Sequence, residues 1–297
     1  MTEFHVPDAL PNGGLARMRS TMATCLKSFG RMPLIPRIAG VVIIAYFIVF
    51  LFAPLLAPYG ESEIVGDQYE AWSSQFLLGT DQLGRDFLSR LIYGARNSIG
   101  IALATTVLSI SLGTMVGIFS ACQGRLVDQL ISRVLDTFLA IPQLIFALIL
   151  IAVFGSSIPI LICIIGFLES LKVARLMRVS AADIVALDYI EAARIQGESE
   201  IWIMLREVLP NMKSIIVAEF GLRFCLVFLL VSALSFLGLG VQPPTADWGS
   251  MVRENATLIT YGEITPLLPA FAIALLAISV NIVMDWAVGA SGGLSDD

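Results

Sequence analysis

Long apolar runs without a charged residue are the main pattern along this sequence, and five of them are visible. They lie between Arg37 and Glu61, Arg96 and Arg125, Asp136 and Glu169, Arg223 and Asp247, and Glu263 and Asp285. A helix that crosses the hydrocarbon core of a bilayer needs about 20 consecutive apolar residues. Each run is long enough to supply one, so the pattern predicts an all-α integral membrane protein.

The third run, residues 137–168, is longer than one crossing requires. As a helix it would extend over roughly 48 Å, whereas the hydrocarbon core is about 30 Å thick. It also contains the segment Gly-Ser-Ser-Ile-Pro at 155–159, whose residue types favour a turn. We therefore predict a hairpin of two crossing helices at 133–154 and 158–177, which raises the total to six.

Charged residues in the second helix of this hairpin need partners, because an isolated charge in lipid is costly. Glu169 and Lys172 are three residues apart and share one helix face, where they can pair. Arg175 and Arg178 can extend their long side chains to the membrane interface. The segment 158–177 can therefore cross the membrane, although its uninterrupted apolar part is short.

Basic residues decide the orientation, since Lys and Arg in short loops accumulate on the cytoplasmic side. With six crossings, 13 of the 18 basic residues fall on the side of the N-terminal tail and four on the opposite side, with Arg223 inside a helix. A single crossing at 137–168 would move the six basic residues of 172–213 to the outside. We therefore predict that both termini are cytoplasmic.

The predicted organisation has five parts. They are a cytoplasmic tail over 1–37, a first transmembrane helix over 38–58, an extracytoplasmic loop over 59–96, a core of five transmembrane helices over 97–288, and a tail over 289–297. The first apolar run comes too late for a cleaved signal peptide, so it is kept as a transmembrane helix. Apolar residues recur at helical spacing in 83–93, which predicts a short interfacial helix within the outer loop.

Composition agrees with a membrane protein and removes several classes of function. Hydrophobic residues make up 57% of the chain and charged residues 14%, which is too little polar material to cover a soluble domain. The net charge of -6 argues against a nucleic-acid partner. The single histidine, His5, lies on the N-terminal tail, so a zinc site or a serine-histidine pair within the membrane cannot be built. We predict no catalytic residue and no metal site, and we interpret four cysteines without C-x-x-C spacing as reduced packing residues: Cys25, Cys122, Cys163 and Cys225.

Two further pairs of residues each allow two interpretations. Gly113 and Gly117 form a small-xxx-small pattern that lets helices approach closely, and packing within this chain is the favoured role. Glu219 and Arg223, four residues apart at the start of the fifth helix, can pair with each other. Charged residues within a transmembrane helix are also functional candidates. The favoured interpretation is that Glu219 and Arg223 neutralise each other near the cytoplasmic interface.

The longest cytoplasmic loop, within 178–213, has the pattern of two short helices around a turn. Residues 189–196 are good helix formers, and Glu191 and Arg194 are three residues apart, so they can pair on one helix face. Gly197 can make the turn, Ser199 can cap the second helix and Pro210 can stop it. Such a segment can rest on the membrane surface or dock in a groove of a partner protein, and composition alone leaves both alternatives open.

Three stretches of the chain resemble one family of transporters. The Glu-Ala-Ala sequence at 191–193, followed by Gly197 and a run ending in Leu-Pro, is similar to the cytoplasmic loop of bacterial ABC importer permeases. The stretch at 78–96 resembles the outer-loop signature of the dipeptide, oligopeptide and nickel permeases, with the sequence LGTDQLGRDFLSRLIYGAR. The stretch at 235–249 resembles the exit from the fifth helix in the same permeases, with SFLGLGVQPP before Asp-Trp-Gly.

This resemblance implies a C-type permease subunit of a type I ABC importer in the bacterial inner membrane, which passes peptides through the lipid bilayer. The implied partners are a B-type permease, two ABC ATPases and an extracytoplasmic substrate-binding protein. The chain has no G-x-x-x-x-G-K-[ST] loop, so it binds no cofactor itself, and ATP and Mg belong to the partner ATPases. The implied residues of the ATPase-coupling loop are Tyr189, Glu191, Ala192, Ala193, Gly197, Trp202 and Pro210. The candidates for facing the binding protein are Glu61, Glu63, Asp67, Glu70, Asp247 and Trp248.

Departures from the family pattern leave the substrate class open. Glu207 stands where an aliphatic residue is usual, and Val231 stands where many relatives carry a glutamate. Nickel chelates, glutathione-like compounds and other small solutes therefore remain alternatives to dipeptides and oligopeptides. A homo-oligomeric channel or an ion-driven carrier is the alternative from another class, but the apolar runs lack the chain of ionisable residues that a relay needs.

The predicted orientation can be tested with single cysteines in a background without the native ones. Ser62→Cys or Thr245→Cys should react in intact cells with a maleimide that does not cross membranes, because both positions lie in predicted outer loops. Ser199→Cys should react only after the cells are permeabilised. Labelling of residue 199 in intact cells would contradict both the orientation and the role of its loop.

Overall fold

The computed structural model describes residues 33–292, and the regular secondary structure in this range is helical, without a strand. The prediction of an all-α chain is confirmed for these residues. Four of their helices are long and apolar enough to cross a membrane: α2 (Leu34–Leu56), α3 (Phe87–Cys122), α10 (Lys213–Phe236) and α12 (Leu267–Gly292). Most of both predicted tails, with His5 and Cys25, lies outside the described residues.

The first long helix lies close to its predicted bounds, whereas the second begins earlier than predicted. α2 matches the first predicted transmembrane helix closely, with a kink at Phe52 where the chain approaches Pro54, which lacks an N–H. The interfacial helix predicted at 83–93 is not a separate element but the beginning of α3. Asp86 caps α3 by accepting a hydrogen bond from the Ser89 N–H at 2.8 Å. No proline follows, so the helix continues unbroken to Cys122.

The third predicted transmembrane helix, 133–154, is divided in the structure. α4 (Arg125–Leu139) and α5 (Gln143–Phe154) meet at a bend of 84°. Pro142 explains the break, because its ring removes a backbone donor and disfavours helical dihedrals at the preceding residue. The bent pair is apolar enough to count as a fifth candidate crossing, so the prediction of one continuous helix at 133–154 was wrong.

The turn predicted at 155–159 is confirmed. Gly155 has a φ of +93° and ends α5, and α6 (Ile158–Val185) begins three residues later. α6 is not among the four candidate crossings named above, and its second half carries the charged residues noted in the sequence.

Arginines of α6 pair with aspartates of α4 and do not simply extend toward solvent. Arg178 Nη2 donates to Asp128 Oδ2 at 2.7 Å, and Arg175 lies 3.7 Å from Asp136. The Arg175 pair is exposed, whereas the Arg178 pair is largely shielded. These contacts hold α4 beside α6.

Close packing of α3 on α6 forms the spine of the bundle. A Cβ atom at Gly113 would lie 2.5 Å from Cβ of Val173, and one at Gly117 would lie 2.8 Å from the Ala174 carbonyl oxygen. Only glycine allows this approach. The interpretation of Gly113 and Gly117 as packing residues within this chain is therefore confirmed.

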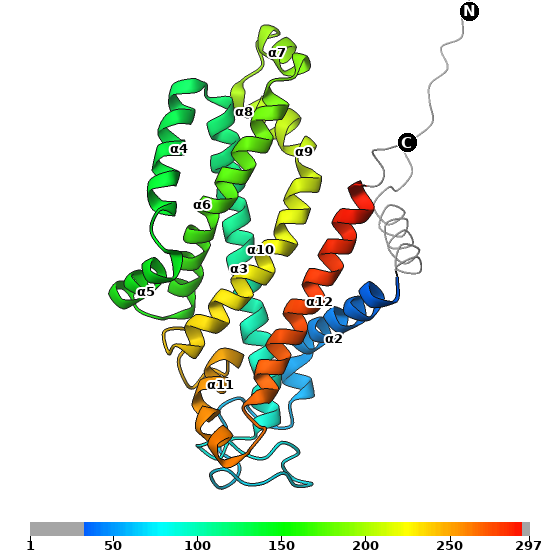
Figure 1. Cartoon of the computed structure of the whole chain (residues 1–297), viewed down its shortest axis with the longest axis vertical. Helices are drawn as coiled ribbons and strands as arrows, with labels where there is room; N and C mark the ends of the chain where they lie inside the picture. Colours follow the sequence, from blue (N-terminus) through cyan, green and yellow to red (C-terminus); the bar gives the residue numbers. More distant parts are fainter. Residues whose placement is uncertain (1–32, 293–297) are drawn as a thin grey trace, which may run out of the picture.

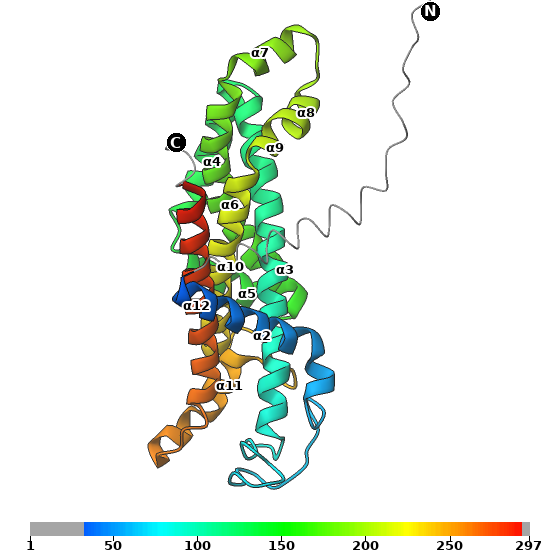
Figure 2. The ribbon, with the colours of Figure 1, turned by 90° about the vertical axis from the view of Figure 1, so that its right-hand side faces the viewer.

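The two predicted docking regions lie at opposite ends of the bundle (Figures 1 and 2). One end carries α7 (Asp188–Ile195), α8 (Glu200–Trp202), the π-helical turn η1 (Ile203–Val208) and α9 (Leu209–Asn211). The other end carries the loop 57–86, α11 (Trp248–Asn255) and the 3-10 helix η2 (Ala256–Tyr261). α2 crosses the bundle obliquely and packs on α3 and α12 (Figure 2).

The close approach of α3 and α6 predicts a specific loss of stability. Gly113→Ala and Gly117→Ala should each lower the free energy of unfolding by about 1–3 kcal/mol, because the added methyl group meets neighbouring atoms that cannot move freely. Gly289→Ala is the matched control, since a Cβ there meets nothing within 4 Å. Thermal unfolding in detergent measures the difference, and equal midpoints for all three variants would refute the packing role.

Candidate functional site

Buried apolar side chains fasten the segment between α6 and α10 onto the end of the bundle. Ile190, Ile203, Val208 and Met212 are fully buried and join a cluster with Met177 of α6. Burial of an aliphatic side chain contributes about 1.5–3 kcal/mol. The segment 188–211 is therefore a fixed part of the bundle, although it projects beyond it (Figure 1).

The turn inside this segment has the geometry that the sequence predicted. Gly197 has a φ of +88°, and a Cβ atom added there would meet nothing within 4 Å. Ser199 caps α8, as its Oγ accepts a hydrogen bond from the Trp202 N–H at 3.3 Å. Pro210 lies within α9, and the helical run breaks at Met212, two residues later than expected.

The predicted pair of Glu191 with Arg194 is replaced by a contact across the turn. Arg194 Nε donates to Glu200 Oε1 at 3.0 Å, and Arg194 Nη2 donates to Glu200 Oε2 at 3.2 Å. The turn at Gly197 brings Glu200 back to α7, where it takes the guanidinium in a two-pronged contact. Glu191 is left exposed and available to a partner.

Side chains of the same segment that point outward form an apolar tip. Ile195, Ile201 and Leu205 are 81%, 69% and 58% exposed, and Trp202 lies beside them at 37%. Ala192 is exposed, whereas Ala193 packs against the buried cluster. Sequence reasoning missed the three aliphatic residues, although their occurrence in a polar loop was a usable signal. Exposed aliphatic groups on a rigid projection are typical of a surface that a partner covers.

Tyr189 and Glu191 border this tip. The Tyr189 hydroxyl accepts a hydrogen bond from Asn211 Nδ2 at 3.1 Å, which ties the start of α7 to the end of α9. Glu191 lines a hollow of about 440 Å³ together with Val185, Ala186, Leu187, Arg194 and Ile195.

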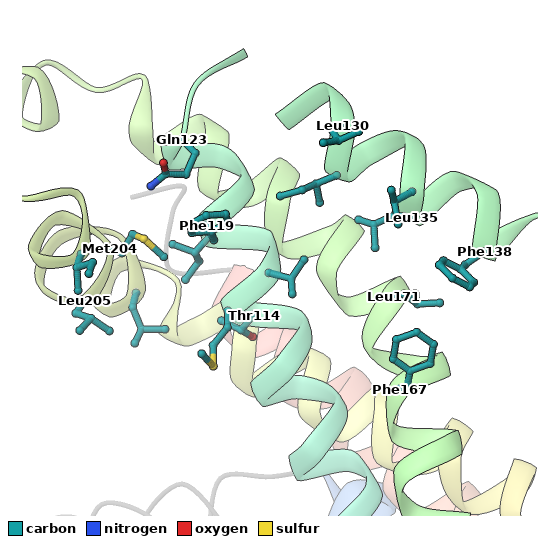
Figure 3. A pocket seen from close by; sticks show the side chains of 17 residues that line it. Thr114, Phe119, Gln123, Leu130, Leu135, Phe138, Phe167, Leu171, Met204 and Leu205 are labelled. Carbon is teal, nitrogen blue, oxygen red and sulfur yellow. The ribbon is translucent and has the colours of Figure 1, made fainter. Parts of the chain in front are cut away.

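A larger apolar pocket opens beside this segment (Figure 3). Its volume is about 860 Å³, and it lies between α3, α4, α6 and η1. Phe119, Leu135 and Phe167 point into it, with Met204 and Leu205 on the side of η1. Ile201 and Leu205 thus belong to both the tip and the pocket wall.

At the opposite end, three of the predicted docking residues are structural. Glu61 Oε1 accepts hydrogen bonds from Asn97 Nδ2 at 2.8 Å and from the Ala246 N–H at 2.5 Å. Asp247 is fully buried, accepts from the Ser98 hydroxyl at 2.7 Å and caps α11. Burial raises the pKa of the Asp247 carboxyl above its usual range.

Trp248 is the third of these structural residues. Its indole N–H donates to the Leu91 carbonyl oxygen at 2.9 Å, and its ring meets Tyr46 and Phe228 edge to face. It is 1% exposed. Asp247 and Trp248 therefore hold the outer end together and offer no side-chain surface to a docking protein.

The remaining candidates of the outer loop are accessible. Glu63 and Asp67 are exposed, and Glu70 is half-buried, where its carboxylate accepts the Asp67 N–H at 2.7 Å. The exposed acidic surface at this end is thus smaller than the sequence suggested.

Sequence reasoning missed a buried ion cluster at the outer end. Arg90, which is 1% exposed, lies 2.5 Å from Asp81 and 3.1 Å from Glu254, and Arg85 Nε donates to Asp81 at 2.7 Å. Burial works against ionisation of Asp81, but backbone hydrogen bonds from residues 85 and 83 and the two arginines together lower its pKa. The cluster joins the start of α3 to α11.

A second ion cluster lies inside the bundle. The two pairs predicted separately, Glu169 with Lys172 and Glu219 with Arg223, are joined because Arg223 Nη1 donates to Glu169 Oε2 at 2.5 Å. Gln143 hydrogen-bonds both Glu169 and Lys172. Within residues 33–292, no group of three or more His, Cys, Asp or Glu side chains is placed to hold a metal ion.

Comparison with known proteins assigns the chain. A family model described as the binding-protein-dependent transport system inner membrane component matches residues 113–292. The chain belongs to this permease family. The match includes the projecting segment 188–211, the bent pair of α4 and α5 and the inner ion cluster, whereas the outer loop 57–86 precedes it.

Three relatives of this permease illustrate the likeness. It is 36% identical to the di/tripeptide transport system permease protein of Pseudomonas aeruginosa over 79% of this chain and 80% of the relative. It is 33% identical to the dipeptide transport system permease protein of Alkalihalophilus pseudofirmus, over 84% and 82%. It is 30% identical to the glutathione transport system permease protein of Pectobacterium atrosepticum, over 83% of each.

Proposed function

We propose that this permease is the C-type membrane subunit of an ATP-driven importer that takes up dipeptides or oligopeptides. The rigid projection at 188–211 carries the proposal, because it presents an apolar tip and Glu191 while the chain has no phosphate-binding loop of its own. The names of two of the three relatives support peptides as the substrate class. Glutathione is itself a peptide-like solute, so the third relative favours the same wide class.

The proposed membrane arrangement has six crossings and both termini in the cytoplasm, in a bacterial inner membrane. α6 supplies the crossing beyond the five candidates, with its charges paired to α4 and α10 and hydrogen-bonded to Gln143 of α5. The uneven distribution of basic residues supports this orientation. The location of the two docking regions at opposite ends of the bundle agrees with it.

In the proposed mechanism, two partner ATPases bind ATP and Mg, and one of them holds the tip of this chain in a surface groove. Ile195, Ile201 and Leu205 are buried there on docking, and Glu191 can pair with a basic residue of the partner. Because Ile190 and Ile203 fix the projection to the bundle, a movement of the ATPases is passed to α6 and α10. A B-type permease completes the pathway, which alternates between inward-facing and outward-facing states.

The outer end is proposed to receive an extracytoplasmic substrate-binding protein. Glu63 and Asp67 give this end exposed negative charge. The end of η2 and the turn that follows it add exposed apolar groups, with Tyr261 82% and Ile264 54% exposed. The half-buried Glu61 and the buried Asp247 and Trp248 hold these surfaces in place.

A bulky side chain or a strained backbone in the projection should uncouple ATP hydrolysis by the partners from substrate uptake. Ala192→Trp adds a large side chain at an exposed position, and Gly197→Val penalises a positive φ. Both variants should pair with the B-type permease but retain less ATPase on co-purification, or lose hydrolysis stimulated by the binding protein in proteoliposomes.

Gly124→Val is the matched control for this experiment. Gly124 also has a positive φ, +84°, and open space around a Cβ, but it lies in the α3–α4 turn outside the projection. It should suffer the same backbone strain and keep its ATPases. Normal uptake by Ala192→Trp and Gly197→Val would show that the projection is not the coupling element.

Removal of exposed acidic groups at the outer end should slow capture of the binding protein. Glu63→Gln combined with Asp67→Asn should reduce the association rate, and the reduction should shrink at high salt, because steering by exposed charges is screened. Surface plasmon resonance on the permease complex in nanodiscs measures this rate. Association that is unchanged at low salt would remove these carboxylates from the docking surface.

A further inference from the structure

The inner ion cluster joins three helices through one arginine. Arg223 of α10 is 7% exposed and contacts Glu219 of the same helix, with Nε donating to Oε1 at 3.0 Å. Its Nη1 reaches Glu169 of α6 at 2.5 Å, and Glu169 is 2% exposed. The guanidinium therefore fixes the relative position of α6 and α10, because its fork binds two carboxylates in a set geometry.

The cluster continues from Glu169 to the bend between α4 and α5. Glu169 Oε1 lies 3.2 Å from Lys172 Nζ, and both groups hydrogen-bond Gln143. Gln143 is the first residue of α5 and directly follows Pro142 at the break. Only two α5 residues, Ala147 and Ile151, are buried, so polar contacts at Gln143 hold the bent end of this helix in place.

The same arginine is connected to the projecting segment through continuous structure. α10 begins directly after Met212, which is fully buried in the cluster that anchors the projection. Arg223 lies 11 residues further along the helix, roughly 16 Å from Met212. A rotation or shift of the projection thus moves Arg223, and Arg223 holds Glu169 and, through it, Gln143.

We propose that Arg223, Glu169 and Gln143 form a positioning joint that makes the α4–α5 bend follow the movement of the projection at 188–211. This inference rests on the proposed function and adds the route by which the coupling segment acts on the middle of the bundle. With the joint intact, α10, α6 and the start of α5 move together. Without it, the ATPases still dock and hydrolyse ATP and α4 stays paired to α6, but the start of α5 no longer follows, so the bend loses its response.

A simpler role for the cluster is neutralisation of buried charge, which would serve insertion and folding alone. Two acids and two bases balance in Glu169, Glu219, Lys172 and Arg223, so charge neutrality does not require Gln143. Gln143→Leu separates the two roles, because it keeps the side chain's size and all four charges while removing the hydrogen bonds to α6. Arg223→Lys is the second variant, since it keeps the charge but loses the fork.

The experiment uses the whole complex, with both permeases, the ATPases and the binding protein, in proteoliposomes. Gln143→Leu and Arg223→Lys should retain hydrolysis stimulated by the binding protein and raise the ATP consumed per molecule taken up by about tenfold. Arg175→Gln is the matched control on α6, because its ion pair with Asp136 is exposed, and its ratio should equal that of the wild type.

A distance measurement gives a readout that a purely structural role would not change. Spin labels are attached at Val153→Cys, near the last residue of α5, and at Val217→Cys on α10. These two positions are 71% and 69% exposed. In a background without native cysteines, a non-hydrolysable ATP analogue should shift their distance in the wild type and not in Gln143→Leu.

The outcomes separate this inference from the proposed function. A wild-type complex that neither binds ATPases nor hydrolyses ATP in response to the binding protein would overturn the proposed function. A wild-type complex that couples normally, alongside variants with the same stoichiometry and the same ATP-dependent distance change, would overturn only the joint. Failure of Arg223→Lys to assemble leaves Gln143→Leu to decide.

Discussion

Gly113 and Gly117 bring the backbones of α3 and α6 into direct contact, and both ends of the molecule are built on that pair. At one end, Met177 of α6 belongs to the cluster that buries Ile190 and Ile203 and so fixes the projecting segment. At the other end, the first turns of α3 carry Arg90, which holds Asp81 and Glu254. The α3–α6 contact therefore sets the projecting end directly, and α3 connects it to the outer end.

Partners for charge are the second constraint on this fold. In lipid there is no water to replace a missing partner, so an ionisable side chain is retained where the protein supplies an opposite charge or a hydrogen bond. Arg178 meets Asp128 on α4, and Arg223 meets carboxylates on α6 and α10. These contacts do more than neutralise charge, because each one fixes two helices against each other at a defined height.

Local signals in the sequence were sufficient for features that depend on a few neighbouring residues. The turn at Gly197, the cap at Ser199 and the hairpin turn at Gly155 need only backbone freedom or one nearby oxygen. The errors concern contacts that depend on how the chain folds back or packs. Arg194 was assigned to Glu191 because its contact with Glu200 depends on the turn geometry. The burial of Asp247 and Trp248 depends on α3, about 150 residues earlier in the chain. Pro142 was a local signal for the break between α4 and α5. It was overlooked because the apolar run continues through it.

The break before α5 also has a consequence for the surroundings of this chain. α5 has 12 residues, a length of about 18 Å, which is shorter than the hydrocarbon core. Backbone that leaves helical geometry at membrane depth is tolerated only where protein covers it or where it borders water. A cavity of about 280 Å³ lies at this break, lined in part by Gln143 and Lys172. In the proposed six-crossing arrangement, the wall of the molecule around residues 140–142 must therefore face hydrated space or a neighbouring subunit and not the lipid tails.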